Sequence, residues 1–256
     1  MNNLMDVLPT LKSPPCESVK LTGSVVSRGS LTNADRDRMY DLLAMYFAGT
    51  TRDRFEADLG EKEAVVLLRD VRGRIQGFST YMRIELPLDG LDIVAFFSGD
   101  TIVAKEYWGE TILSRLWSQT VFAEADRIVA GHPSAQIYWF LICSGYKTFR
   151  FLPVFFREFY PHPASATPPT VSRILNSLGR RKFGQHYNVA SGIVRLPHAT
   201  PLRSGVADLT AHRLRDPLVA FFTAMNPHHD EGDELACITR ICRTNLTHAG
   251  ERMVGP

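Results

Sequence analysis

The stretch Ala104-Lys-Glu-Tyr-Trp-Gly-Glu-Thr-Ile-Leu113 joins two segments of different hydrophobic periodicity. Before it, residues 91–103 read as a buried strand, and after it the apolar residues recur at helical spacing as far as Ala125. A strand that turns through a glycine into a helix leaves main-chain N–H groups and the positive end of the helix dipole unpaired in front of the turn. This stretch therefore predicts a place for an anionic ligand.

The composition bounds the class of protein. Of the 256 residues 45% are hydrophobic and 22% charged, so the chain can bury one core with a smaller appended unit, and a net charge of +2 is too small to indicate a nucleic-acid partner. No run of about 20 apolar residues occurs, so we expect no membrane span. The four cysteines lack a C-x-x-C pair and His228–Glu231 lacks a helix-spaced histidine pair, so we expect no metal and a reducing, cytoplasmic location.

Turn-forming residues divide the first half of the chain into short elements. Residues 19–28 are expected to form a strand, either Thr32 or Asn33 is expected to cap one helix, and Thr51 is expected to cap the next. Asp70–Arg74 and Pro87–Gly90 read as tight turns. They predict an antiparallel meander of three strands over residues 64–69, 75–86 and 91–103.

The second half is expected to contain more helix than strand. Further helices are predicted over residues 134–144, 170–178, 217–224 and 233–246, and strands over residues 128–130, 146–159 and 192–196. The chain is thus predicted to be an α/β protein with a mixed, mostly antiparallel sheet flanked by helices. Because residues 161–169 resemble a linker, we expect a disordered lead over 1–18, the main domain over 19–160 and an α-rich C-terminal extension over 161–256.

The order of elements over residues 19–160 resembles the GCN5-related N-acetyltransferase (GNAT) superfamily. Ala104–Gly109 looks like the end of that family's fourth strand and the start of its pyrophosphate-binding turn. Ser134–Tyr146 looks like its fourth helix, with the closing glycine at Gly145 and an aromatic residue after it. The resemblance implies a fold of this kind and an acyl-coenzyme A co-substrate.

The chain departs from the family's pattern at two places. The family's turn usually reads Arg/Gln-x-x-Gly-x-Gly/Ala, whereas Thr111 and Leu113 stand near the later small positions here. The family's fourth helix often has a tyrosine four residues before the closing glycine; that position is Leu141, and Tyr138 lies one turn earlier. The chain therefore resembles an atypical member, similar in architecture to the long-chain N-acyl amino acid synthases that use acyl carrier protein.

The resemblance implies an N-acyltransferase. The donor would be a thioester, acyl-coenzyme A or the acyl-phosphopantetheine of acyl carrier protein, and the acceptor the amine of a small molecule or amino acid. Two alternatives stay open: a catalytically inactive scaffold that binds a ligand or a protein, and an enzyme that acylates a protein lysine or N-terminus. The C-terminal extension is expected to cover the acceptor side of the cleft or to mediate self-association as a homodimer.

Acid–base groups are expected near the end of the third meander strand. Asp100 lies in an otherwise apolar strand, where burial would raise its pKa, and it is the expected base; the alternative is a bulge with the carboxylate in solvent. Glu106 is a second candidate base, with a surface position before the helix as the alternative. Tyr138 and Tyr146 are candidate acids toward the leaving thiolate, with core packing as the alternative.

The donor is expected to bind along the main chain. The strand Phe97–Val103, with Ile102 and Val103 at its end, would supply an N–H to the thioester carbonyl. Four residues of the turn would hold the donor's phosphate through main-chain N–H groups: Trp108, Gly109, Glu110 and Thr111. The alternative is a plain helix N-terminus with Trp108 packed on the core. The aromatic residues between 138 and 159 leave two interpretations open, an apolar tunnel for a fatty or aromatic acyl chain and an ordinary core.

Overall fold

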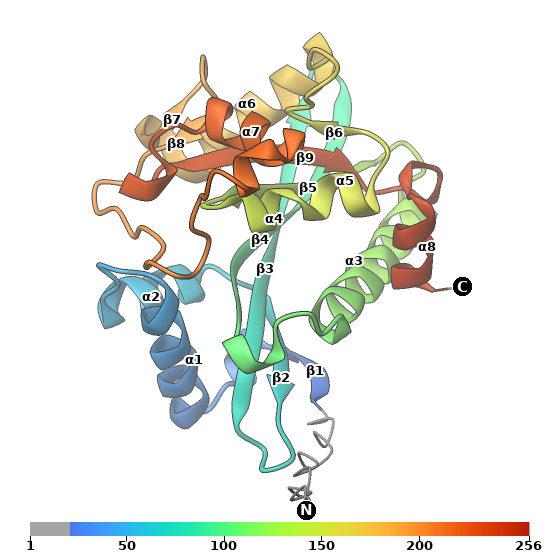
Figure 1. Ribbon diagram of the computed structural model, residues 1–256. Helices are drawn as coiled ribbons and strands as arrows, with labels where there is room; N and C mark the ends of the chain where they lie inside the picture. The colour runs from blue at the N-terminus through green and yellow to red at the C-terminus, as the bar shows by residue number, and fades with distance from the viewer. Residues whose placement is uncertain (1–20, 256) are drawn as a thin grey trace, which may run out of the picture.

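A computed structural model describes residues 21–255, so the lead expected over residues 1–18 lies outside the described part of the chain. The described residues form a nine-stranded sheet of order β1-β2-β3-β4-β5-β9-β8-β7, with β6 paired to β9 (Figure 1). The strands are β1 (Thr22–Ser27), β2 (Ala64–Arg69), β3 (Ile75–Leu88), β4 (Leu91–Val103), β5 (Gln136–Cys143), β6 (Phe159–Tyr160), β7 (Tyr187–Asn188), β8 (Ile193–Val194) and β9 (Glu234–Arg240).

Only one strand pair in this sheet is parallel. β4 runs parallel to β5, and the other pairs are antiparallel. The predicted fold class, a mixed and mostly antiparallel sheet flanked by helices, is confirmed. The helices are α1 (Asn33–Tyr46), α2 (Arg52–Gly60), α3 (Ile112–Gly131), α4 (Tyr146–Phe149), α5 (Phe151–Phe155), α6 (Pro169–Phe183), α7 (Pro217–Met225) and α8 (His248–Val254).

The helices cover the two faces of the sheet with separate cores. α3, α4, α5 and α7 pack on one face, against side chains such as Phe96 and Leu141. α6 packs on the other face, against Phe97 and Phe140, and α1 and α2 continue that layer over β2 and β3. No helix within residues 21–255 is long and apolar enough to cross a membrane.

The predicted meander is confirmed. β2 and β4 have the predicted bounds, and β3 extends two residues further, to Leu88. Asp70 closes the first turn by accepting from the main-chain N–H groups of Arg72 and Arg74 at 2.9 and 3.0 Å. The predicted cap at Thr32 forms a reciprocal capping box with Asp35, which fixes the start of α1.

Beyond the start of α3, four of the predicted elements are wrong. Residues 128–130 belong to α3 instead of a strand, and residues 134–144, predicted as a helix, form β5. The strand-rich prediction for 146–159 is replaced by α4 and α5, with Phe159 as the first of the two residues of β6, and half of 233–246 forms β9. β5 and β9 lie between two helical layers and are apolar on both sides, so alternation, the usual signature of a strand, is absent from them.

The chain after Tyr160 contributes to the same sheet. The helices predicted at 170–178 and 217–224 are present as α6 and α7, and the strand predicted at 192–196 is present as β8. β9 lies between β5 and β8, pairing along Tyr138–Cys143 on one side. The segment predicted as an extension therefore supplies three helices and three strands, of which β9 borders the site described next.

Candidate active site

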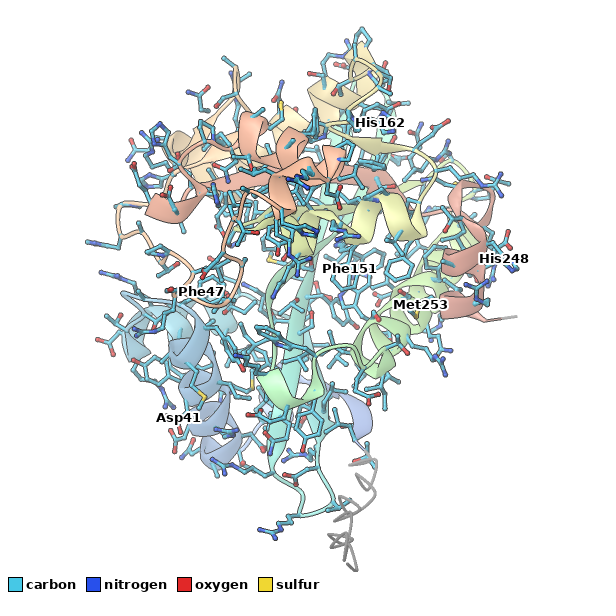
Figure 2. All side chains as sticks on the ribbon, in the orientation of Figure 1. Asp41, Phe47, Phe151, His162, His248 and Met253 are labelled. Carbon is cyan, nitrogen blue, oxygen red and sulfur yellow. The ribbon has the colours of Figure 1, made fainter. Side chains whose placement is uncertain are left out.

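A cavity of about 290 Å³ opens where β4 and β5 separate. The two strands pair in parallel from Ile93 to Ser98, and β4 then continues to Val103 without β5 beside it. Side chains from both layers line the opening; Phe47 follows α1 and Phe151 begins α5, on the two sides of it (Figure 2). The separation of one parallel strand pair thus gives the cavity access to both faces of the sheet.

A β-bulge shapes the β4 side of this opening. Gly99 and Asp100 together face the single residue Thr80 on β3, since Ser79 pairs with Thr101 and Tyr81 with Ser98. A Cβ atom on Gly99 would lie 2.5 Å from both the Cε atom of Lys62 and the Oγ1 atom of Thr80. Glycine is therefore required for Lys62 to pass under the strand.

The half of the cavity toward α2 and α6 is charged. Asp58, Asp100 and Lys182 line it, and Lys62 lies beside it with its side chain fully buried. The Lys62 ammonium binds the Asp58 carboxylate at 2.6 Å, and the Lys182 ammonium lies 3.9 Å from the same carboxylate. Lys182 also pairs with Glu61. Both lysines are thus directed to acids on α2 and its C-terminal turn.

Asp100 has the electrostatics of a group that titrates near neutral pH. Burial, and then the negative charge of Asp58, raise the pKa of Asp100 to about 7, against the lowering effect of Lys62 and Lys182. The bulge predicted as the alternative for this residue is present, but its carboxyl lines the cavity. The Asp100 carboxyl is therefore ionised in only part of the molecules at neutral pH.

A second carboxyl reaches the cavity from β9. Glu234 accepts a hydrogen bond from the hydroxyl of Ser144, the residue that follows β5. Burial raises the pKa of Glu234 to about 7; the Ser144 hydrogen bond opposes this, and the charges of Asp100 and Asp58 add to it. The charge of Asp100 is thus one of the causes that raise the pKa of Glu234, and both residues line the same cavity.

The half of the cavity toward α3 and α5 is apolar. The Trp117 and Trp139 rings lie 4.7 Å apart between centroids, and Phe156 packs on Trp139. The Trp139 Nε1 donates to the Ser98 Oγ at 2.9 Å, and Ser98 is the residue directly before the bulge. Leu113, Ser114, Ser118, Thr148, Phe151 and Phe155 complete the lining of this half.

The other predicted acid–base residues lie away from the cavity lining. Glu106 is exposed in the short helix η2 (Lys105–Tyr107). Tyr138 lies in β5, not in a helix, and its buried hydroxyl donates to Gln136 Oε1 at 3.0 Å; burial raises its pKa. Tyr146 is buried in the core at the start of α4. Asp100 is the predicted acid–base residue that the structure places in the cavity.

The predicted donor turn is partly closed by its own hydrogen bonds. The N–H groups of Trp108 and Glu110 already donate to main-chain carbonyls at 3.2 and 3.1 Å, whereas Gly109 adopts φ 105°, where glycine is favoured. Thr111 precedes α3 without a side-chain cap. Of the strand residues expected to meet the donor, Ile102 is buried in the α1 core and Val103 is half-buried, its carbonyl accepting from Trp108 Nε1.

Sequence reasoning missed most of the charged half. Glu234 was assigned to a helix and Ser144 to the end of another, so neither was connected with Asp100. Asp58 lies on a predicted helix, and Lys182 lies four residues beyond the predicted end of another; no catalytic motif surrounds either residue. The available signal was the run Leu235–Thr239, whose β-branched residues and short length favour a buried strand. Among residues 21–255, no group of three or more potential ligands is arranged to hold a metal ion.

Comparison with known proteins gives weak likenesses only. No family model and no curated protein matches the chain. Among solved structures, it is similar to the GNAT-family N-acetyltransferase YhbS from Escherichia coli in complex with CoA, at 14% identity and a TM-score of 0.34, over 55% of this chain and 70% of that chain.

Two further structures show similar values. A conserved protein of unknown function from Enterococcus faecalis, described as a probable N-acyltransferase, has 11% identity and a TM-score of 0.40, over 86% of this chain and 66% of that one. The ribosomal-protein-alanine N-acetyltransferase from Brucella melitensis has 13% identity and a TM-score of 0.35, over 52% and 90%. At these values the site has to be argued from the chain's own residues.

Proposed function

We propose that this protein is an N-acyltransferase that moves an acyl group from a thioester to the amine of a small molecule or amino acid. The observation that carries the proposal is the pair Asp100 and Glu234 at the separation of β4 and β5, between a charged and an apolar half of one cavity. A carboxyl with a pKa of about 7 is suited to accept a proton at neutral pH.

The reaction assigns a separate task to each part of the cavity. An ionised carboxylate of the pair takes a proton from the incoming ammonium, and the neutral amine attacks the thioester carbonyl carbon. The part of β4 beyond Ser98 has left β5, so main-chain N–H groups there are available to the developing oxyanion. The carbon–sulfur bond then breaks, the thiolate takes up the proton from the protonated carboxyl, and the second proton of the attacking nitrogen passes to the carboxylate so regenerated and from there to solvent.

The apolar half supports an acyl group longer than acetyl. Two tryptophans in tilted contact and the phenylalanines of α5 line it, and they offer an acetyl group far more apolar surface than it can cover. The donor is acyl-coenzyme A or an acylated carrier protein, and its thioester would lie at Ser98. The charged half between α2 and α6 receives the amine, since its carboxyls attract an ammonium ion.

The test measures thiol release. The full chain is incubated with acetyl-, octanoyl- or dodecanoyl-CoA and a panel of amino acids and small amines, and free thiol and acylated product are followed together. We expect amine-dependent release that is faster with the longer chains. The control is the double variant Asp100→Asn/Glu234→Gln, which should bind donor without releasing thiol.

Two results would decide against the proposal. Donor binding without release for any amine would favour the catalytically inactive scaffold. Release with a lysine-bearing peptide alone would favour acylation of a protein acceptor.

A further inference from the structure

The residue that follows β5 lies opposite the first residue of β9. Cys143 pairs with Leu235, so the next step of the antiparallel register brings Ser144 beside Glu234. On the other side of β9, Glu234 pairs with Val194 of β8. The main chain of Glu234 is therefore held between two strands, and its side chain lines the cavity together with that of Ser144.

A single hydroxyl supports the Glu234 carboxyl. Among residues 21–255, the Ser144 hydroxyl is the one hydrogen-bond donor to this carboxyl, and it bonds to Oε1. No cation of these residues lies within ion-pair distance of Glu234. Oε2 has no donor in this part of the chain and is not enclosed by protein atoms, so it is open to a ligand in the cavity.

The surroundings of Glu234 favour its neutral form. Burial, and the charges of Asp100, Asp58 and Asp233, raise the pKa of Glu234, and the Ser144 hydrogen bond is the influence that lowers it. Arg195, at the end of β8, is bound to Asp233 at 2.6 and 2.8 Å. Further ionisable groups on the elements around Glu234 are Arg54, Cys143, Lys182 and His198. The ionised form of Glu234 therefore depends on the Ser144 contact.

We propose that Ser144 positions Glu234 for proton transfer by holding Oε1 and leaving Oε2 to the ammonium group of the acceptor. This inference rests on the proposed function and concerns the molecules in which Glu234 is the ionised carboxylate. One proton passes from the ammonium nitrogen to Oε2, and the neutral amine that results attacks the thioester. Ser144 keeps its own proton throughout, so it acts through Glu234 and is a positioning residue.

The test measures the ionisation of Glu234 separately from that of Asp100. The full chain, labelled with ¹³C at the side-chain carboxyl of glutamate, is titrated by NMR, and Glu234→Gln identifies the signal. Ser144→Ala removes the donor and Ser144→Thr keeps it. Ser30→Ala is the matched control, because the Ser30 hydroxyl donates to a main-chain carbonyl outside the cavity lining. Thermal unfolding verifies that each variant is folded.

We expect the pKa of Glu234 to rise by about one unit in Ser144→Ala and to return in Ser144→Thr, since a hydrogen bond to a charged group favours that charge. A raised pKa leaves less of the base ionised at neutral pH. The kcat of amine-dependent thiol release should therefore fall roughly fivefold at neutral pH and recover in alkaline buffer. KM for the donor should stay unchanged, because Ser144 acts on the carboxyl.

Three results would overturn this role of Ser144 and leave the proposed function standing. They are an unchanged Glu234 pKa in folded Ser144→Ala, a raised pKa with an unmoved pH–rate profile, and a loss of kcat at every pH that threonine does not restore. Failure of the wild-type chain to release thiol with any amine would overturn the proposed function, and this inference with it, whatever the NMR titration gives.

Discussion

The two halves of the cavity share one wall and differ in chemistry. Toward α3 and α5 the lining is mostly tryptophan and phenylalanine, with a few hydroxyl side chains, and Trp139 donates to Ser98 there. Toward α2 and α6 the lining carries Asp100 and Glu234, with Lys62 and Lys182 nearby. An apolar and a charged compartment meeting at one strand separation fit two substrates that meet at a single reacting bond.

The bulge in β4 explains how one strand serves both compartments. Ser98 faces Trp139 on the α3 side, whereas Gly99 and Asp100 turn together toward Lys62 and α2. Regular alternation would return the residue two positions after Ser98 to the apolar side. Because of the extra residue, the carboxyl of Asp100 lies on the α2 side of β4. Without the bulge, regular alternation would place it on the side of the tryptophans.

Removing the carboxyls of the charged half should have the largest effect on turnover. Asp100→Asn and Glu234→Gln should each lower amine-dependent turnover by about a hundredfold, since a general base contributes that much or more. The measurement is kcat with saturating donor, and Asp126→Asn on the outer face of α3 is the control. Full activity of both folded variants would mean that the charged half takes no part in proton transfer.

Filling the apolar half should act on the acyl chain alone. Ser118→Phe on α3 adds a ring inside the cavity, so kcat/KM for dodecanoyl-CoA should fall roughly tenfold while that for acetyl-CoA is retained. The exposed neighbour Arg115→Phe is the matched control. An equal fall for both donors would contradict the assignment of this half to the acyl chain.

Changing the charges around Asp100 should shift the pH dependence in opposite directions. A base must be ionised, so the rate should rise with pH through about 7, the pKa of Asp100. Lys62→Met removes a charge that lowers this pKa and should move the rise to higher pH; Asp58→Asn removes a charge that raises the pKa and should move it to lower pH. Shifts of the same sign in the two pH–rate profiles would exclude Asp100 as the titrating group.

The smallest effect is expected for the hydrogen bond between Ser98 and Trp139, which lies where the two halves of the cavity meet. Ser98→Ala removes the hydrogen bond from Trp139 and should lower the free energy of unfolding by about 0.5–1.5 kcal/mol in urea titrations. Ser134→Ala, which removes an exposed contact to Asp92, should change it by less than about 0.5 kcal/mol. A larger loss at Ser134 than at Ser98 would show that this wall contributes little to stability.

Local signals were sufficient for the first half of the fold. Asp70 and Gly73 mark a turn by their own chemistry, and Thr32 with Asp35 marks a helix start, so the elements around them were predicted correctly. β5 and β9 offered no such signal. Each is a short apolar run buried on both faces, and only pairing with a distant strand decides between helix and strand.

The site residues show the same difference between local signals and distant strand pairing. Asp100 was recognisable because a single acid in an apolar strand is unusual, and its neighbourhood could be argued locally. Glu234 reaches the same cavity only because β9 pairs with β5, with Leu141 opposite Cys237, and these strands are far apart in the sequence. The aromatic residues were noticed, but which of them line a cavity depends on the face of β5 that each one occupies.

The position of β9 bears on how the molecule comes into being. As the polypeptide leaves the ribosome, Asp100 emerges long before Glu234, and β5 has no neighbour on its far side until Glu234–Arg240 has been synthesised. A nascent chain that lacks this strand exposes one edge of a central apolar strand and holds half of its carboxyl pair. Synthesis must therefore have passed Arg240 before the chemistry proposed here can begin.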